Sequence, residues 1–358
     1  MGEKKVTVEF VEDVALICID NPPVNASGVA VRQGIVDALE EIKATGSSKA
    51  IGLYCAGRTF IAGADITEFG KPPLEPGLPE VCNILEDNET PIVAVIHGTA
   101  LGGGLETAMG CHARVAVPTA KVGLPEVLLG ILPGAGGTQR APRLSGVANA
   151  LDLILSGRHV PAKDALAMGL VDRIDEGEPR AVALAAAKDV VAGTLATRRT
   201  GELTTTPDDA SIEATMAAVQ KKHPHLISPQ KCVECVAAST GNFQEGLAFE
   251  RARFMECLPS PQSKGLIHAF FGERAVANIP EKKAQPRDIA SIGVIGGGTM
   301  GSGISTSALM AGLPVTLIEV SQEGLDRGVA TITGNLDGSV KRGKMSQEKR
   351  DAALAKLT

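Results

Sequence analysis

The chain has 358 residues, of which 44% are hydrophobic and 21% are charged, so it can bury a sizeable core, and this composition argues against wholesale disorder. The formal charge of −6 and the aromatic content of 3% argue against nucleic-acid binding, because such proteins present cationic surfaces and stacking side chains. No apolar run is long enough for a membrane span, and seven cysteines scattered through apolar stretches indicate reduced thiols. We therefore expect a protein of the cytoplasm or of an organelle matrix.

The first part of the chain alternates between strand-like and helix-like patterns. Residues 6–20 alternate around a charged break and predict a pair of strands, residues 29–43 have helical spacing, and KAIGLYCAG at 49–57 predicts a short buried strand. The same order then repeats as helix, strand, short helix and strand, at residues 78–86, 91–98, 103–111 and 113–117. This alternation predicts a mostly parallel α/β core with ligand-binding loops at the strand ends.

The composition changes beyond about residue 178, where Ala-rich and charged helical stretches follow one another with almost no strand pattern. The prolines and mixed charges of PEKKAQPRD at 280–288 mark a linker. We expect an α/β core at 1–190, a helical extension with a linker helix at 191–287, and a partial nucleotide-binding domain at 288–358. Because roughly 70 residues are too few for two βαβ halves, we infer a fragment or a truncated chain.

Two Gly-rich loops follow buried strands in the predicted core, GRTFIAGADITEF at 57–69 and GTALGGGLE at 98–106. Glycine allows close approach of the backbone, and a loop that enters a helix presents unpaired N–H groups. Two such groups can form an oxyanion hole. An oxyanion hole stabilises the enolate that develops when a thioester reacts at Cα or Cβ.

Two glutamates accompany these loops. Glu106 follows the triple glycine in the first turn of its predicted helix, where the helix N-terminus favours the ionised carboxylate. Glu126 lies in KVGLPEVLLG, where apolar neighbours desolvate the carboxyl group and raise its pKa. Two carboxyl groups in unlike environments can divide the roles of general acid and general base. Taken alone, a glutamate after a Gly turn is more simply explained as a solvated residue at a helix start.

At these residues the sequence resembles a known family. The segments NPPVNA, AGADI, ALGGGLE and LPEVLLGILPGAGGTQR match the enoyl-CoA hydratase/isomerase (crotonase) superfamily in order, over roughly residues 5–190. The resemblance implies an α/β fold with a crotonase-type ββα spiral core. It also implies that the backbone N–H groups of Ala64 and Gly103 form the oxyanion hole for an acyl thioester, and that Ala62 and Ile66 contact the adenine of CoA, the carrier of the substrate.

The same resemblance implies roles for the glutamates. Hydratases of this family have glutamates at both positions, so Glu106 would activate the water that adds at Cβ and Glu126 would give the proton to Cα. Gly134 matches a backbone donor near that water. The expected activity is hydration of trans-2-enoyl-CoA to 3-hydroxyacyl-CoA. Two alternatives stay open: double-bond isomerisation, for which Glu126 alone would suffice, and a non-catalytic module that binds acyl-CoA or serves in assembly.

A second group of motif residues begins the last predicted domain. Gly296, Gly298 and Gly301 satisfy GxGxxG between a strand pattern and a helix pattern, and Glu319 closes the next strand. This arrangement places a pyrophosphate on a helix N-terminus and a carboxylate at the ribose 2′-OH, which favours NAD over NADP. The segment resembles the start of 3-hydroxyacyl-CoA dehydrogenases, in which the position of Met300 contacts NAD. Because the catalytic His of that family would lie after the last residue of this sequence, we do not expect hydride transfer from this chain.

The order of hydratase and dehydrogenase resembles the multifunctional proteins of fatty-acid β-oxidation. The stretch GLIHAFFGERAVANIP resembles their linker helix, in which Glu273 is the nearest match to an acidic substrate contact. For a full-length protein of this kind, the resemblance leaves open self-association or a thiolase partner. No metal site is predicted, because Cys232 and Cys235 are spaced as packing residues of a helix.

Overall fold

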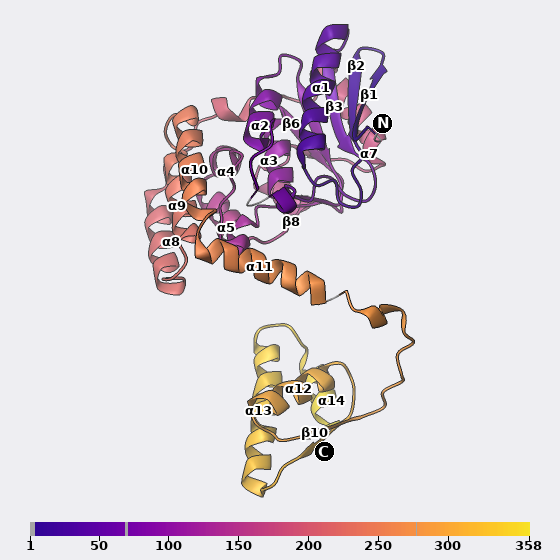
Figure 1. Ribbon diagram of the computed structural model, residues 1–358, viewed down its shortest axis with the longest axis vertical. Coiled ribbons are helices and arrows are strands. Elements are labelled where there is room, and N and C mark those ends of the chain that lie inside the picture. Colours follow the sequence, from indigo (N-terminus) through magenta and orange to yellow (C-terminus); the bar gives the residue numbers. More distant parts are fainter. Residues whose placement is uncertain (1–3, 69–70, 277) are drawn as a thin grey trace. The chain divides into compact units, whose positions relative to one another are not determined.

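The computed structural model describes residues 4–68, 71–276 and 278–358. The chain divides into two compact units, Met1–Ala277 and Asn278–Thr358. The first unit contains the α/β core and the helices that follow it, and the second contains the segment with the GxGxxG motif (Figure 1). The linker residues 278–287, which the sequence pattern places in the helical extension, belong to the second unit.

A six-stranded sheet forms the centre of the first unit, in the spatial order β1-β2-β3-β4-β6-β9. β1 and β2 pair antiparallel, with Val6 opposite Ile19, and the other neighbouring strands pair in parallel. The pair of strands predicted at 6–20 and the mostly parallel core are therefore confirmed, whereas the short β9 has no strand pattern in the sequence. The six strands span Val6–Val11, Val14–Ile19, Ala50–Cys55, Ile92–Ile96, Ala113–Ala116 and Arg173–Ile174.

Apolar residues cover both faces of this sheet. Ile92, Ala94 and Ile96 of β4 belong to a large apolar cluster that includes residues of α1 (Val29–Thr45), α2 (Leu78–Asp87) and α3 (Gly103–Gly110). The alternate residues Val93 and Val95 belong to a second cluster with α7 (Pro179–Ala192). Successive side chains of a strand point to opposite faces of the sheet. Both faces are buried here, which explains why every residue of β4 is apolar.

A small three-stranded sheet positions the two glutamates. It consists of β5 (Thr99–Leu101), β7 (Lys121–Gly123) and β8 (Val160–Pro161). β5 and β7 pair in parallel, with Leu101 opposite Gly123. β5 leads into α3, and β7 leads into the 3-10 helix η2 (Glu126–Leu129). Because the carboxyl ends of the two strands meet, the starts of α3 and η2 are brought side by side.

Further helices surround this edge of the first unit. α9 packs against α4, α5, α8 and α10, and α11 contacts η2. The side chain of Asn242 caps α10 by accepting hydrogen bonds from the amides of Gln244 and Glu245. The helices span Gly137–Ser145 (α4), Val147–Ser156 (α5), Ala162–Ala167 (α6), Asp209–Lys222 (α8), Ser228–Ala238 (α9), Phe243–Cys257 (α10) and Pro261–Val276 (α11); two short 3-10 helices span Ile66–Glu68 (η1) and Thr200–Glu202 (η3). Another 3-10 helix, Pro280–Lys283 (η4), belongs to the second unit.

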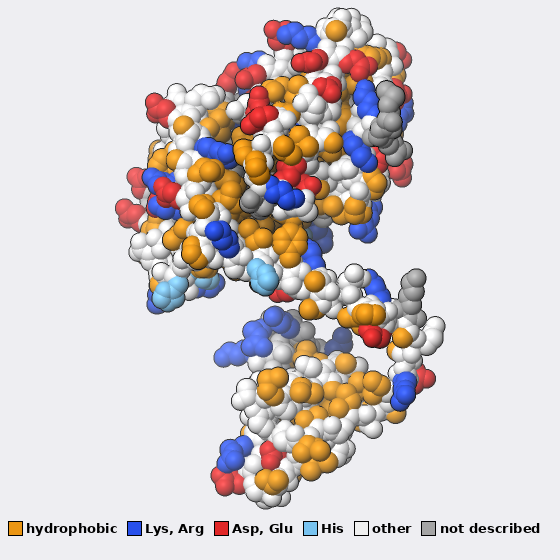
Figure 2. All heavy atoms as spheres, in the orientation of Figure 1, with side chains coloured by type: hydrophobic (Ala, Val, Ile, Leu, Met, Phe, Trp, Pro, Cys, Tyr) orange, Lys and Arg blue, Asp and Glu red, His pale blue; other side chains and the backbone are white. Residues whose placement is uncertain are grey.

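The second unit has the predicted order of strand, helix and strand. β10 (Ile292–Ile295) and β11 (Val315–Ile318) pair in parallel around α12 (Thr299–Met310), and α13 (Gln322–Lys341) and α14 (Gln347–Leu354) follow. Throughout the described ranges, no helix has both the length and the apolar composition needed to cross a bilayer. Acidic and basic side chains are interspersed on the visible face of the first unit (Figure 2).

Candidate active site

A cavity of about 550 Å³ is lined by both Gly-rich loops, η2 and α11. Ala62, Ala64 and Ile66 of the first loop line it. Gly103, at the start of α3, and Glu126, at the start of η2, also line it. The structure therefore brings together five of the residues selected from the sequence.

The amides of Ala64 and Gly103 lie close together at this cavity. A Cβ placed on Gly103 would lie 3.3 Å from the Ala64 nitrogen. Gly103 begins α3, and neither the Ala64 N–H nor the Gly103 N–H has a backbone acceptor among the described residues. Unpaired amides at a helix start suit an oxygen with partial negative charge. A thioester carbonyl placed between them would be polarised.

Glu126 lines the cavity with a carboxyl group, one oxygen of which has no donor among the described residues. Its Oε2 is buried and has no hydrogen-bond partner among the described residues. Burial raises the pKa of Glu126 well above its usual 4.5, and the charge of Glu106 adds to this effect. The raised pKa agrees with the expectation from the apolar flanks of Glu126. A protonated carboxyl group at this position can act as an acid.

Glu106 is 2% exposed and does not line the cavity itself. Its Oε1 accepts hydrogen bonds from the amides of Ala135, at 2.7 Å, and Gly137, at 2.8 Å. Burial nevertheless raises the pKa of Glu106, although these two donors and the charge of Arg140 lower it. The pKa of Glu106 is therefore raised overall, and the favoured ionisation expected from its place at a helix start is outweighed by burial of the carboxyl group.

Gly134 and Glu273 lie outside the group of residues that line the cavity. Gly134 packs against α10, where a Cβ on Gly134 would lie 2.5 Å from the ring of Phe254. Glu273 is exposed on α11, and that helix contributes Phe270 and Arg274 to the cavity instead. The roles expected for Gly134 and Glu273 stay predictions.

One buried acid next to the site was not selected from the sequence. Glu250 of α10 is 1% exposed. Its carboxyl group accepts hydrogen bonds from the Gly136 amide at 2.6 Å, the Thr138 amide at 2.9 Å and the Thr138 hydroxyl at 2.6 Å. Burial, followed by the charge of Glu106, raises the pKa of Glu250 to about 8. Glu250 could not be selected from the sequence, because this residue lies outside both Gly-rich loops of the core and outside the GxGxxG motif.

Arg140, at the end of the LPGAGGTQR segment, is a buried cation that the sequence analysis also missed. Its guanidinium donates to Glu86 at 2.7 Å, to the Asn83 side chain at 2.8 Å and to the Ala135 carbonyl at 3.0 Å. Arg140 therefore ties the segment that contacts Glu106 to α2. The charge of Glu86 compensates the buried guanidinium.

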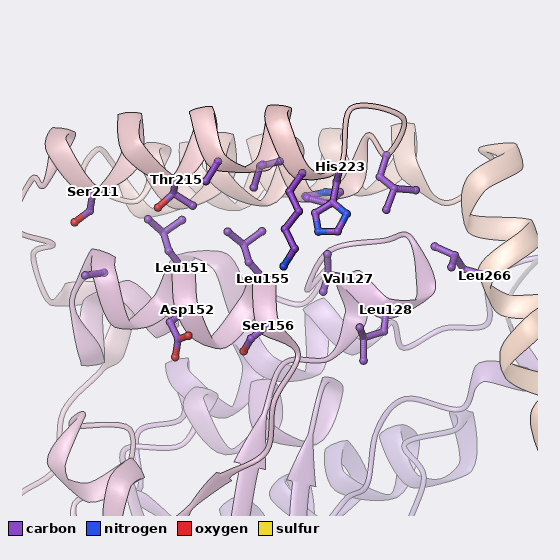
Figure 3. Close-up of a pocket in the computed structure, with 16 residues that line it drawn as sticks. Val127, Leu128, Leu151, Asp152, Leu155, Ser156, Ser211, Thr215, His223 and Leu266 are labelled. Atoms are coloured by element: carbon purple, nitrogen blue, oxygen red, sulfur yellow. The ribbon is translucent and has the colours of Figure 1, made fainter. Parts of the chain in front are cut away.

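A second cavity, of about 530 Å³, is lined by residues of η2, α5 and α8 (Figure 3). Leu151 and Leu155 of α5 point toward α8 and form much of its apolar wall. Leu128 of η2 lines both cavities. Neither Glu106 nor Glu126 lines this second cavity, so it is distinct from the site of the two glutamates.

The residues of the GxGxxG motif surround the start of α12. A Cβ placed on Gly301 would lie 1.7 Å from the Gly296 carbonyl oxygen, so only glycine allows this approach of helix and strand. Glu319 accepts a hydrogen bond from the Gly297 amide at 2.5 Å, and this amide is the main cause of the lowered pKa of Glu319. Met300, in the first turn of α12, is 76% exposed. These contacts form a tight turn from β10 into α12, and the roles expected for these residues in binding NAD stay predictions.

Comparisons with known proteins identify two families. Residues 9–229 match the family described as enoyl-CoA hydratase/isomerase. Residues 291–358 match the NAD-binding domain of 3-hydroxyacyl-CoA dehydrogenase. Among solved structures, an enoyl-CoA hydratase/isomerase from Pseudoalteromonas atlantica T6c aligns with a TM-score of 0.56 and 25% identity, covering 75% of this chain and 98% of that one.

Two curated relatives match nearly the whole of this chain. A peroxisomal bifunctional enzyme of Danio rerio is 40% identical over 338 residues, which cover 92% of this chain and 47% of that protein. A peroxisomal fatty acid beta-oxidation multifunctional protein of Arabidopsis thaliana is 36% identical over 370 residues, which cover 98% of this chain and 51% of that protein. The chain therefore spans about half the length of these relatives.

Proposed function

Because the chain belongs to the enoyl-CoA hydratase/isomerase family, we propose that its first unit hydrates trans-2-enoyl-CoA to 3-hydroxyacyl-CoA. The observation that supports this most directly is the pair of glutamates in unlike environments. Glu106 accepts two amide hydrogen bonds, whereas Glu126 has a buried oxygen without a donor. Hydration needs one group that takes a proton from water and another that gives a proton to carbon.

In this mechanism, the N–H groups of Ala64 and Gly103 hold the thioester oxygen and stabilise the negative charge that develops on it. Glu106 accepts a proton from a water molecule as the water oxygen bonds to Cβ. The electron pair of the double bond moves toward the carbonyl group, and Cα takes the proton of Glu126. Ala62 and Ile66, at the cavity wall, would contact the adenine of CoA.

The test is the variant Glu126→Gln, which keeps the shape of the side chain but removes the proton that it donates. We expect the hydration of crotonyl-CoA, followed by loss of the conjugated-thioester absorbance, to slow by at least about 100-fold. Binding of the CoA thioester should change little, because the amides of Ala64 and Gly103 are untouched. An unchanged rate would contradict the assignment of Glu126.

One observation favours double-bond isomerisation as a second candidate: Glu126 lines the cavity and Glu106 does not. A single acid can move a proton between two carbons of a 3-enoyl-CoA. The variant Glu106→Gln separates the two activities, because it should abolish hydration and spare isomerisation. Tight acyl-CoA binding with no turnover of either substrate would instead favour a non-catalytic module.

For the second unit, we propose NAD binding within a longer multifunctional protein of fatty-acid β-oxidation. The tight approach of Gly301 to Gly296 leaves the backbone at the start of α12 accessible to a pyrophosphate. Glu319 would accept a hydrogen bond from a ribose hydroxyl, and Met300 would contact the cofactor. Bound NAD would accept a hydride from a 3-hydroxyacyl thioester.

A further inference from the structure

One face of α10 is directed at the segment that contacts Glu106. Gly246, Glu250 and Phe254 are spaced by four residues and therefore lie on the same side of this helix. A Cβ on Gly246 would lie 2.1 Å from the side-chain oxygen of Gln139, and the Phe254 ring packs against Gly134. Glu250 lies between these two close contacts. This face of α10 therefore contacts the segment 134–139 from one end of the segment to the other.

Glu250 and Glu106 bind alternate amides of this segment. The amides of Ala135 and Gly137 donate to Glu106. The amides of Gly136 and Thr138 donate to Glu250. The backbone is thus held from two sides by two carboxyl groups, just where α4 begins. In this arrangement, each amide that donates to Glu106 is followed by one that donates to Glu250.

We propose that Glu250 is a positioning residue, which holds the amides of Gly136 and Thr138 so that those of Ala135 and Gly137 point at Glu106. The proposal rests on the proposed role of Glu106 in hydration. Without Glu250, the Gly136 and Thr138 amides lose their acceptor in a buried place, and the segment must turn to find another. Such a turn withdraws the two donors from Glu106 and shifts its carboxyl group.

The kinetic test compares substitutions at two glutamates of the same helix. Glu250→Met removes both acceptor oxygens with little change in length, and we expect kcat for crotonyl-CoA hydration to fall about 100-fold, the effect of a displacement of about 1 Å. KM should stay within about twofold. Glu250→Gln keeps one acceptor oxygen, so its loss should be nearer tenfold. Glu245→Met is the control, because Glu245 is exposed on α10.

A double variant distinguishes positioning from general destabilisation. If Glu250 acts through Glu106, the variant that combines Glu106→Gln with Glu250→Gln should be no slower than Glu106→Gln alone. A double variant that is slower by the full factor of Glu250→Gln would overturn the proposal. A folded Glu250→Met protein with the wild-type kcat would overturn it as well.

Amide-resolved hydrogen exchange tests the same proposal without any activity. In Glu250→Gln, we expect the amides of Ala135 and Gly137, which Glu250 does not touch, to exchange at least about tenfold faster than in the wild type. Glu245→Gln should leave them unchanged. Acceleration confined to Gly136 and Thr138 would refute the positioning role. This measurement decides the proposal even if crotonyl-CoA is not a substrate, an outcome that would contradict the proposed function alone.

Discussion

Gly102 controls the distance between the oxyanion loop and Glu126. Its backbone has a φ of 52°, and a Cβ placed on it would lie 2.8 Å from Oε1 of Glu126. In Gly102→Ala, this contact must lengthen to at least about 3.4 Å, so the carboxyl group or the loop moves by roughly 0.6 Å. Because a displacement of 1 Å can cost about 100-fold in rate, we expect kcat for crotonyl-CoA hydration to fall by about tenfold.

The matched control for Gly102→Ala is Gly193→Ala. Gly193 also has a positive φ, of 74°, but no atom lies within 4 Å of its added Cβ. Gly193→Ala carries the strain of a left-handed alanine, about 1–2 kcal/mol. Gly102 has a ψ of −125°, so Gly102→Ala carries backbone strain of at least that size, and urea denaturation would report a lower free energy of unfolding for both variants. Only Gly102→Ala should also slow the reaction. Equal kcat values for the two variants would refute the steric reasoning.

Two further predictions concern stability. Arg140→Met leaves Glu86 buried without its cation, so we expect the free energy of unfolding in urea to fall by about 3–5 kcal/mol. The control Arg158→Met breaks the exposed ion pair with Asp152 and should lower it by less than about 1 kcal/mol. Equal losses in the two variants would contradict the role of burial. The pKa of Glu250 is about 8 in the folded protein against an ordinary 4.5, so between these values the folded state keeps a proton that the unfolded state has lost. The free energy of unfolding should therefore fall as the pH rises from about 5 to 8. In Glu250→Gln, urea midpoints measured across that range should fall less steeply with pH than in the wild type. An unchanged dependence of the midpoint on pH would contradict the raised pKa of Glu250.

The core and the site loops were predictable because their signals are local. Parallel strands end at one edge of a sheet, so Gly-rich segments that directly follow strands must meet there. Glu106 and Glu126 lie a few residues beyond the paired strands β5 and β7, and the pairing of Leu101 with Gly123 brings them together. That pairing itself was not predicted and comes from the structure. The same reasoning holds for the GxGxxG motif, which contains its own strand, turn and helix.

The residues that the sequence did not predict depend on packing between distant segments. Glu250 is separated from Glu106 by 144 residues (250 − 106), and only the docking of α10 on α4 brings it to the site. The choice of Glu273 on α11 depended on the rotation of a helix about its axis, and the structure directs Phe270 and Arg274 to the cavity instead. The sign of the pKa change at Glu106 depended on complete burial, which no local pattern reports.

The distribution of hydrogen-bond donors decides which acid of the site holds a proton. Glu106 and Glu126 are both desolvated, and the charge of Glu106 further disfavours ionisation of Glu126. Two amides stabilise the ionised form of Glu106, whereas Oε2 of Glu126 has no donor among the described residues. The first proton taken up by the pair therefore goes to Glu126. In the proposed hydration, this order would leave an acid facing the cavity and a base at the loop, the division of charge that addition of water to a conjugated thioester requires.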